Sequence, residues 1–161
     1  MSKNLFESLY KQYYAMVHQM CLGFVKGDQD IASDLAQEVF IIIWKKLETF
    51  REESSHKTWI YRITVNKCLE FIRKEKQKRT VPISEQDFDV KAESKEHQEA
   101  LISDLHRAIG QLKELDRLII MMVLEGQDYE DISDVIGINP VNTRVKIHRI
   151  KKRLKKILSN E

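Results

Sequence analysis

The sequence predicts an all-α protein with two small helical domains joined by a flexible linker. The chain of 161 residues holds five glycines and two prolines, too few for turn-rich β-sandwiches and barrels. No glycine or proline occurs between Gly27 and Pro82, which favours long helices. The segment 80–100 is polar and acidic and contains a proline, as expected of a tether. We therefore predict a three-helix domain over residues 1–79 and a four-helix domain over 101–161.

The first domain is predicted to contain helices at about 4–25, 29–49 and 58–78, with a loop at 50–57. The apolar run Val39–Trp44 would also suit a buried strand, but the flanking sequences ASDLAQE and KKLE are good helix formers. In a helix, six successive apolar residues at ~100° each surround the axis, so part of the run must face away from the domain's own core. Its rim is polar, and such a surface indicates a protein partner unless a neighbouring helix covers it.

The loop and the third helix combine polar, aromatic, basic and amide side chains. Aromatic rings stack on unpaired bases and cations pair with phosphates, so this combination suits single-stranded nucleic acid. Isolated aromatic residues lie in a core more often, and that alternative stays open for Trp59 and Tyr61.

In the second domain a helical pattern resumes after the linker and ends at Gly126, a predicted C-cap. Asp128 is expected to cap a short helix that ends at Gly137, and Asn139 to cap a last helix that opens with Pro140. The inward stripe of the last helix is Thr143, Ile147, Ile150, Leu154 and Ile157. A short helix, a glycine-containing turn and a second helix with a basic outward face predict a helix-turn-helix, whose second helix can enter the DNA major groove.

The net charge of +2 conceals a segregation of charge along the chain. Residues 1–79 hold 14 Lys and Arg against 10 Asp and Glu, residues 80–100 hold 2 against 6, and residues 101–161 hold 11 against 9. Eight cations and no acid occur within residues 140–158. Basic stretches in both domains could bind a polyanion, because each neutralised phosphate releases counterions, although charge runs are more often solvated helix faces.

No catalytic pattern competes with nucleic-acid binding. There is no H-E-x-x-H motif, no nucleophile elbow and no phosphate-cradling glycine loop. His18 and Cys21 are too few for a metal site, so we expect no metal, no cofactor and no enzyme activity. Cys21 and Cys68 form no C-x-x-C pair and are expected as reduced, packed thiols. Neither a membrane span nor a secretory signal is visible, which predicts a cytoplasmic protein without direct membrane insertion.

Four motifs follow one another in the first domain: DLAQEVFIIIW, FREESSHKTW, WIYRITVNK and RKEKQKR. The second domain reads LKELDRLIIMMVLEGQDYEDISDVIGINPVNTRVKIHRIKKRL. Their order and spacing resemble regions 2 and 4 of the extracytoplasmic-function (ECF) sigma factors, in the sigma-70 family of RNA polymerase sigma factors. The resemblance covers nearly the whole chain apart from the connector. It implies a promoter-specificity subunit whose partners are core RNA polymerase, promoter DNA and an anti-sigma factor that is often membrane-anchored.

The resemblance also implies residue roles. It assigns polymerase binding to Asp34, Gln37, Glu38, Phe40, Ile41 and Trp44. It assigns recognition and melting of the −10 promoter element to Glu53, Ser54, Ser55, His56, Lys57, Trp59, Arg62, Asn66 and Lys67. It assigns the −35 element to Asn142, Arg144, Val145, Lys146, His148, Arg149 and Lys152.

Three positions depart from the family pattern. Thr143 replaces a buried branched aliphatic residue and needs a partner for its hydroxyl. Lys113 replaces a frequent proline, and Asp128 replaces a serine that it equals as a helix cap. Two other functions stay open at this point: a free-standing dimeric helix-turn-helix transcriptional regulator, and a purely structural helical module.

Overall fold

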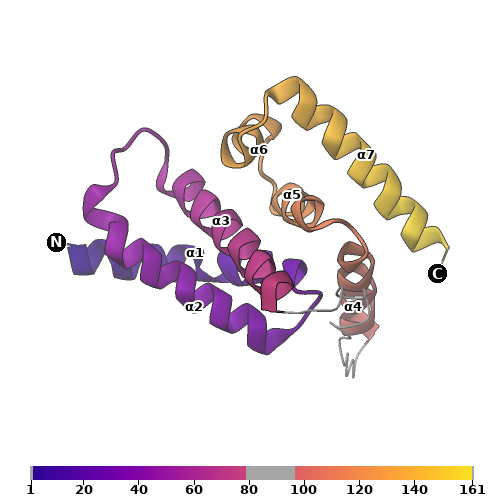
Figure 1. Cartoon of the computed structure of the whole chain (residues 1–161), viewed down its shortest axis with the longest axis horizontal. Coiled ribbons are helices and arrows are strands. Elements are labelled where there is room, and N and C mark those ends of the chain that lie inside the picture. The colour runs from indigo at the N-terminus through magenta and orange to yellow at the C-terminus, as the bar shows by residue number, and fades with distance from the viewer. Residues whose placement is uncertain (1, 79–96, 161) are drawn as a thin grey trace.

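All regular elements of the described chain are helices. The computed structural model describes residues 2–78 and 97–160, except for the side chains of 97–103. The elements are α1 (Ser2–Phe24), α2 (Gln29–Lys46), the short 3-10 helix η1 (Leu47–Thr49), α3 (His56–Lys78), α4 (His97–Gly110), α5 (Glu114–Leu124), α6 (Tyr129–Ile136) and α7 (Pro140–Ser159). Helices α1 to α3 form module 1 (residues 2–78) and α4 to α7 form module 2 (residues 97–160), side by side in Figure 1. The all-helical fold and the two helical modules are confirmed.

The helices of module 1 begin and end close to the predicted positions. The Asp28 carboxylate accepts a hydrogen bond from Ile31 N at 3.1 Å and so begins α2 where expected. The last predicted turn of the second helix, Leu47–Thr49, is η1 rather than α-helix. Helix α3 begins two residues earlier than predicted, because Ser55 Oγ accepts from Thr58 N at 3.1 Å and acts as its cap.

In module 2 the local capping signals are confirmed. The Asp128 carboxylate accepts a hydrogen bond from Asp131 N at 2.8 Å and caps α6. The side chain of Asn139, the residue before Pro140, accepts one from Asn142 N at 2.8 Å and caps α7. Gly126 and Gly137 both have a positive φ, of 83° and 74°. Gly126 and Asp128 set the turn between α5 and α6, and Gly137 and Asn139 set the turn between α6 and α7. Helix α4 begins at His97, inside the predicted linker 80–100, and the rest of that linker lies outside the described residues.

The buried apolar side chains form one continuous core that runs through both modules. Helix α1 packs against α2 and α3 of its own module and also against α5, while α3 packs against α6. Cys21 and Cys68 are both buried and free, with their Sγ atoms 4.0 Å apart, as expected of packed thiols. The hydrogen bond between the two thiols and burial raise the pKa of Cys68, which keeps that sulfur unreactive.

Candidate functional surfaces

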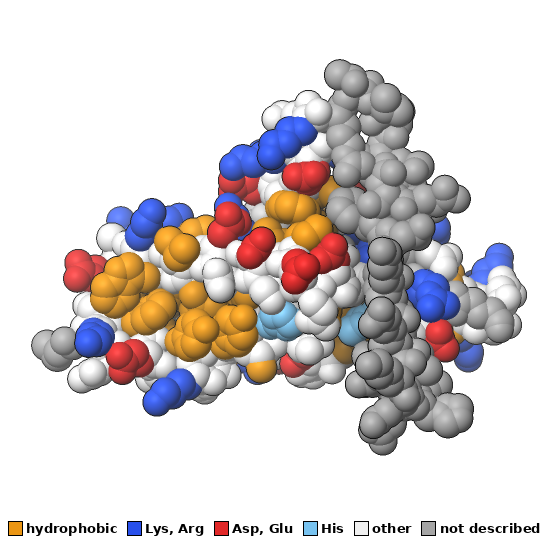
Figure 2. Space-filling view, turned by 90° about the horizontal axis from the view of Figure 1, so that it is seen from below, with side chains coloured by type: hydrophobic (Ala, Val, Ile, Leu, Met, Phe, Trp, Pro, Cys, Tyr) orange, Lys and Arg blue, Asp and Glu red, His pale blue; other side chains and the backbone are white. Residues whose placement is uncertain are grey.

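An apolar groove lies between α1 and α2, on the face that Figure 2 shows covered with apolar side chains. Ile41 and Trp44 remain 52% and 49% exposed, so the apolar run of α2 leaves a face that the described residues cover only in part. We call this surface the aromatic groove; it has a volume of about 360 Å³ and is lined by Phe6, Tyr10, Gln37, Phe40, Ile41 and Trp44.

Phe40 is placed differently from the other apolar residues assigned to polymerase binding. It is only 3% exposed, because its ring lies 4.9 Å from that of Tyr10 and 6.3 Å from that of Phe6. Phe40 therefore lines the groove from its floor rather than from its exposed edge, and its contact with a partner stays a prediction. Phe6 and Tyr10 are groove residues that the motif comparison did not assign, although their spacing of four along α1 places them on one helix face.

The polar rim of the groove lies on α2. Asp34, Gln37 and Glu38 are all exposed, as a partner surface requires. Glu38 also forms an ion pair with Lys67 of α3, with 3.4 Å between Oε2 and Nζ. The Lys67 side chain is 16% exposed and lies 3.7 Å from Glu70 as well, so two carboxylates hold this predicted DNA contact against the module.

The loop before α3 ends in an aromatic cluster. The Phe50 ring lies 4.7 Å from the rings of both His56 and Trp59. His56 and Lys57 belong to the first turn of α3, so the loop is two residues shorter at this end than the predicted 50–57. Trp59 is half-buried on this cluster, and Tyr61 lies in the core.

The remaining −10 candidates differ in accessibility. Glu53, Ser55 and Asn66 are exposed, whereas Ser54 is partly covered. Arg62 donates from Nε to the Asp134 carbonyl of α6 at 3.3 Å. The structure therefore presents Asn66 to solvent and holds Arg62 against module 2.

A buried hydroxyl pair joins the two helices of the helix-turn-helix. Thr143 is fully buried, and Ser133 Oγ lies 2.8 Å from Thr143 Oγ1 and 2.8 Å from the Tyr129 carbonyl. Thr143 Oγ1 in turn donates to the Asn139 carbonyl at 2.9 Å. The partner that the Thr143 hydroxyl requires is thus Ser133 together with the turn itself.

This pair yields a stability prediction. Thr143→Ala should lower the free energy of unfolding of the full chain by about 1–2 kcal/mol, because a methyl group and a buried hydrogen bond are lost. Thr143→Val should cost less, about 1 kcal/mol, because it leaves no buried polar group without a partner. The Ser133 hydroxyl still donates to the Tyr129 carbonyl, and the Asn139 carbonyl still accepts from the amide of residue 143. Urea unfolding measures both changes; equal losses for the two variants would contradict this account.

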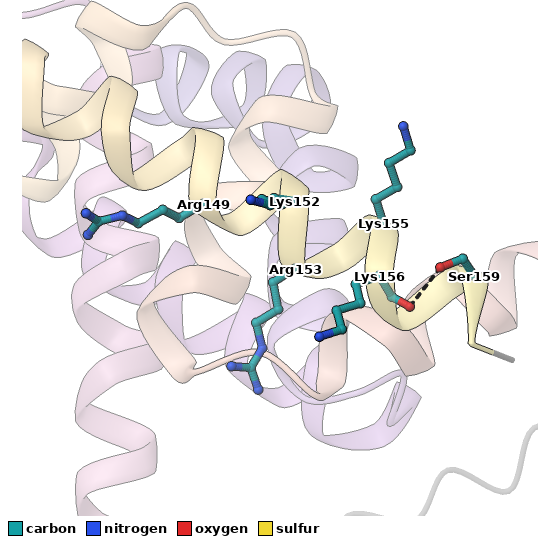
Figure 3. A pocket seen from close by; sticks show the side chains of 6 residues that line it. All are labelled: Arg149, Lys152, Arg153, Lys155, Lys156 and Ser159. Carbon is teal, nitrogen blue, oxygen red and sulfur yellow. Dashed lines mark hydrogen bonds between the residues drawn. The ribbon is translucent and has the colours of Figure 1, made fainter.

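The outward face of α7 carries the predicted −35 residues. Asn142, Arg144, Val145, His148, Arg149 and Lys152 are all exposed. Lys146 is partly covered and forms an ion pair with Asp116 of α5 at 3.4 Å, and Lys151 Nζ contacts Tyr129 Oη at 3.0 Å. Figure 3 shows the cationic face continuing from Arg149 through Lys152 and Arg153 toward the C-terminal end of the helix.

Neither a metal-binding cluster nor a membrane-spanning helix is found among the described residues. No group of three or more His, Cys, Asp and Glu side chains is placed to hold a metal among residues 2–78 and 97–160. The same residues contain no helix that is long and apolar enough to cross a membrane. His18, the ligand candidate next to Cys21, instead lies 3.4 Å from Ser33 Oγ and stacks on Tyr14.

The comparison with known proteins covers both modules. The model of sigma-70 region 2 matches residues 9–78 and the model of sigma-70 region 4 matches residues 102–154. The RNA polymerase sigma-H factor of Pseudomonas aeruginosa is 30% identical over 97% of this chain and 87% of its own. The ECF RNA polymerase sigma factor SigE of Mycolicibacterium smegmatis is 28% identical over 95% of this chain, which spans 61% of the length of SigE. A solved structure of the sigma factor RpoE from Bartonella quintana, in complex with the anti-sigma factor NepR, has the same fold, with a TM-score of 0.74, 21% identity and 96% of both chains covered.

Proposed function

Because this chain belongs to the sigma-70 family as an ECF sigma factor with regions 2 and 4, a class that directs promoter-specific transcription initiation, we propose how its surfaces divide that work. Residues 1–79 bind core RNA polymerase and open the −10 element, residues 80–100 connect, and residues 101–161 read the −35 element. The observation that carries the proposal is the pair Ile41 and Trp44, which the described residues leave about half exposed. A match of residues 9–78 to a sigma region decides against the free-standing regulator, which needs a dimerisation or sensing domain there.

The aromatic groove is the proposed polymerase contact. Large apolar and aromatic side chains at the centre of a concave surface with a polar rim are the arrangement of a protein-binding hot spot. Trp44 and Ile41 insert into the partner, Phe6 and Tyr10 form the α1 wall, and Asp34 supplies part of the charged rim.

The loop after η1 and the exposed face of α3 are the proposed −10 surface. Melting a promoter requires unstacked bases to be held, and an aromatic cluster beside polar loop residues can hold a flipped base. Trp59 and His56 supply rings, and Asn66 supplies an amide that can pair with a base edge.

Helix α7 is the proposed −35 reader. Its first exposed turns carry an amide at Asn142 and a guanidinium at Arg144, which can make bidentate contacts with adenine and guanine in the major groove. The exposed cations further along, such as Lys152, suit phosphates and contribute affinity without sequence preference.

Two further parts of the proposal concern the cell. The likeness to a sigma factor solved with an anti-sigma factor supports an anti-sigma partner for this chain. That partner can be membrane-anchored, and we propose no direct membrane insertion for the chain itself. Core polymerase and promoter DNA place the working protein in the cytoplasm.

Transcription with purified components tests the proposal. Core RNA polymerase is incubated with the full chain and a library of genomic fragments, and the 5′ ends of the transcripts are mapped. We expect starts at defined sites that share two sequence elements. Random starts, or no co-purification of the chain with core polymerase, would contradict the proposed function.

The −10 surface gives a separate prediction. Trp59→Ala should leave polymerase binding within about threefold of wild type and reduce open-complex formation by roughly tenfold, because stacking on one ring is worth about 1–3 kcal/mol. Reactivity of unpaired thymines toward permanganate measures the opening. A promoter whose −10 region is already mismatched is the control and should restore initiation; unchanged opening on duplex DNA would exclude Trp59 from this role.

A further inference from the structure

One ion pair connects the surface proposed for polymerase with the surface proposed for the −10 element. Glu38 lies on the polar rim of the aromatic groove, and Lys67 belongs to the −10 surface. The Glu38 Oε2 and Lys67 Nζ atoms are 3.4 Å apart, so the pair joins α2 to α3. Each of the two residues is therefore assigned to a different macromolecule, although in the free chain they bind each other.

The paired state of Lys67 limits what it can contribute to DNA binding. Its side chain is 16% exposed, and its ammonium group lies 3.4 Å from Glu38 and 3.7 Å from Glu70. A cation adds to DNA affinity when it neutralises a phosphate and releases counterions. An ammonium group that two carboxylates already neutralise gains little from a phosphate until one of the carboxylates has another partner. The neighbouring Asn66 is exposed and needs no such release.

Glu38 is the carboxylate that can change its partner. Glu70 is held more closely by Lys74, at 2.8 Å and one turn further along α3. The hydrogen bond from Lys74, and then the charge of Lys67, lower the pKa of the Glu70 carboxyl. Glu70 therefore keeps a partner when Lys67 leaves. Glu38 lies on a different helix, and its side chain is 53% exposed, so a second protein can reach it.

The rim around Glu38 suits a basic partner. Asp34 precedes Glu38 by four residues on α2, so the two carboxylates share one helix face, and both are exposed. Two carboxylates beside the exposed apolar side chain of Ile41 are complementary to a protein surface that presents basic side chains around an apolar centre. A basic side chain bound at this rim competes with Lys67 for Glu38.

We propose that Glu38 couples polymerase binding to DNA binding by an exchange of ion-pair partners. A basic side chain of core polymerase pairs with the Glu38 carboxylate, and Lys67 pairs with a phosphate of the −10 element. One ion pair is replaced by two, and no proton is transferred. Glu38 is thus a positioning residue for Lys67 as well as a part of the rim. The inference rests on the proposed function, because it requires the partners assigned there to the two surfaces.

The exchange must act in both directions. If Lys67 and the polymerase compete for Glu38, the removal of Lys67 strengthens polymerase binding, and DNA that binds Lys67 does the same. Partly exposed ion pairs contribute little to affinity, so each effect is expected to be roughly two- to fivefold in Kd.

A double-mutant cycle on the full chain measures this competition. The Kd for core polymerase without DNA is determined by fluorescence anisotropy for the wild type, Lys67→Gln, Glu38→Gln and the double variant. We expect Lys67→Gln to bind roughly two- to fivefold more tightly than the wild type, because Glu38 becomes available to the polymerase. In the Glu38→Gln background, the same substitution of Lys67 should leave the Kd unchanged.

Arg73→Gln is the matched control for the loss of one positive charge. Arg73 is an exposed cation of the same helix, and among the described residues it pairs with neither Glu38 nor Glu70. It should leave the Kd for core polymerase unchanged. An equal gain in affinity from Arg73→Gln and Lys67→Gln would reveal a general effect of charge and overturn the exchange. Unchanged or weaker binding of Lys67→Gln would overturn it as well.

The DNA half of the exchange is measured by salt dependence. Binding to single-stranded −10 DNA from the promoters that the transcription assay maps is followed at several salt concentrations. In the holoenzyme, Lys67→Gln should reduce the slope of log K against log salt by roughly 0.7, the amount expected for one phosphate contact on a single strand. Without polymerase it should leave DNA binding by the full chain unchanged. An unchanged slope in the holoenzyme, or an equal loss in the free chain, would overturn the inference.

The cycle also separates this inference from the proposed function. If the wild-type chain does not bind core polymerase, the proposed function is wrong and the exchange falls with it. If the wild type binds but Lys67→Gln has the same effect with and without Glu38, the proposed function stands and only the exchange is refuted.

Discussion

Trp44→Ala is expected to abolish stable binding of the chain to core RNA polymerase. About half of Trp44 is exposed. Its indole ring packs edge-on against the Phe6 ring, with 5.2 Å between the ring centres, at the edge of the aromatic groove. Truncation of a central aromatic residue in a protein interface costs about 2–4 kcal/mol, or roughly 30- to 1,000-fold in Kd. Fluorescence anisotropy of the labelled chain, titrated with core polymerase, measures the loss.

The fold should survive this change because Trp44 is not a core residue. A matched control is Lys45→Ala, which removes the exposed neighbour of Trp44 without touching the groove. Ile41→Asp should reproduce the loss from the other exposed apolar position by burying an unpaired charge in the interface. Wild-type affinity of Trp44→Ala, with the control also unchanged, would remove the aromatic groove as the polymerase contact.

Local signals made the helix-turn-helix predictable. A cap needs only a side-chain oxygen within three residues of a free amide, and a left-handed turn needs only a glycine, so Asp128, Asn139 and Gly137 could be identified from their own neighbours. The start of α3 was less predictable. The β-branched and aromatic residues that follow His56 and Lys57 have a low helix propensity, so these two residues were predicted to belong to the loop. In the structure they are helical, because Ser55 caps α3.

The aromatic groove was predictable in part. Six consecutive apolar residues require an exposed apolar face, but periodicity alone does not say which of them it includes, and Phe40 is buried while Ile41 is not. The choice depends on the α1 residues Phe6 and Tyr10, which approach from a different part of the sequence. Tertiary packing therefore decides which motif residues are available to a partner.

The contact between the modules was not predicted. The linker composition and the two motif sets indicate separate domains, and a glycine inside a helix is ordinarily only a weak point in that helix. The structure explains Gly23 and Gly110, because Met121 and Lys26 occupy the space that a Cβ atom at these two positions would fill. Long-range contacts of this kind leave no periodic pattern in the sequence.

Arg144→Ala and Asn142→Ala are expected to change the promoter preference of the holoenzyme rather than its assembly. Both side chains are exposed in the first turns of α7, close to the cap residue Asn139, and they flank the buried Thr143 in the sequence. A bidentate contact to one base is worth about 1–3 kcal/mol of discrimination, or roughly 5- to 150-fold. Each variant should lose that discrimination at one −35 position and keep it at the others.

The control separates base contacts from phosphate contacts. Lys152→Ala should weaken binding to all sequences equally and reduce the dependence of log K on log salt by roughly one, the amount expected for one lost phosphate contact. Competition between promoters that differ at single −35 positions, at two salt concentrations, measures both effects. If Arg144→Ala behaves as Lys152→Ala does, its guanidinium binds the backbone, and the −35 sequence is read elsewhere on α7.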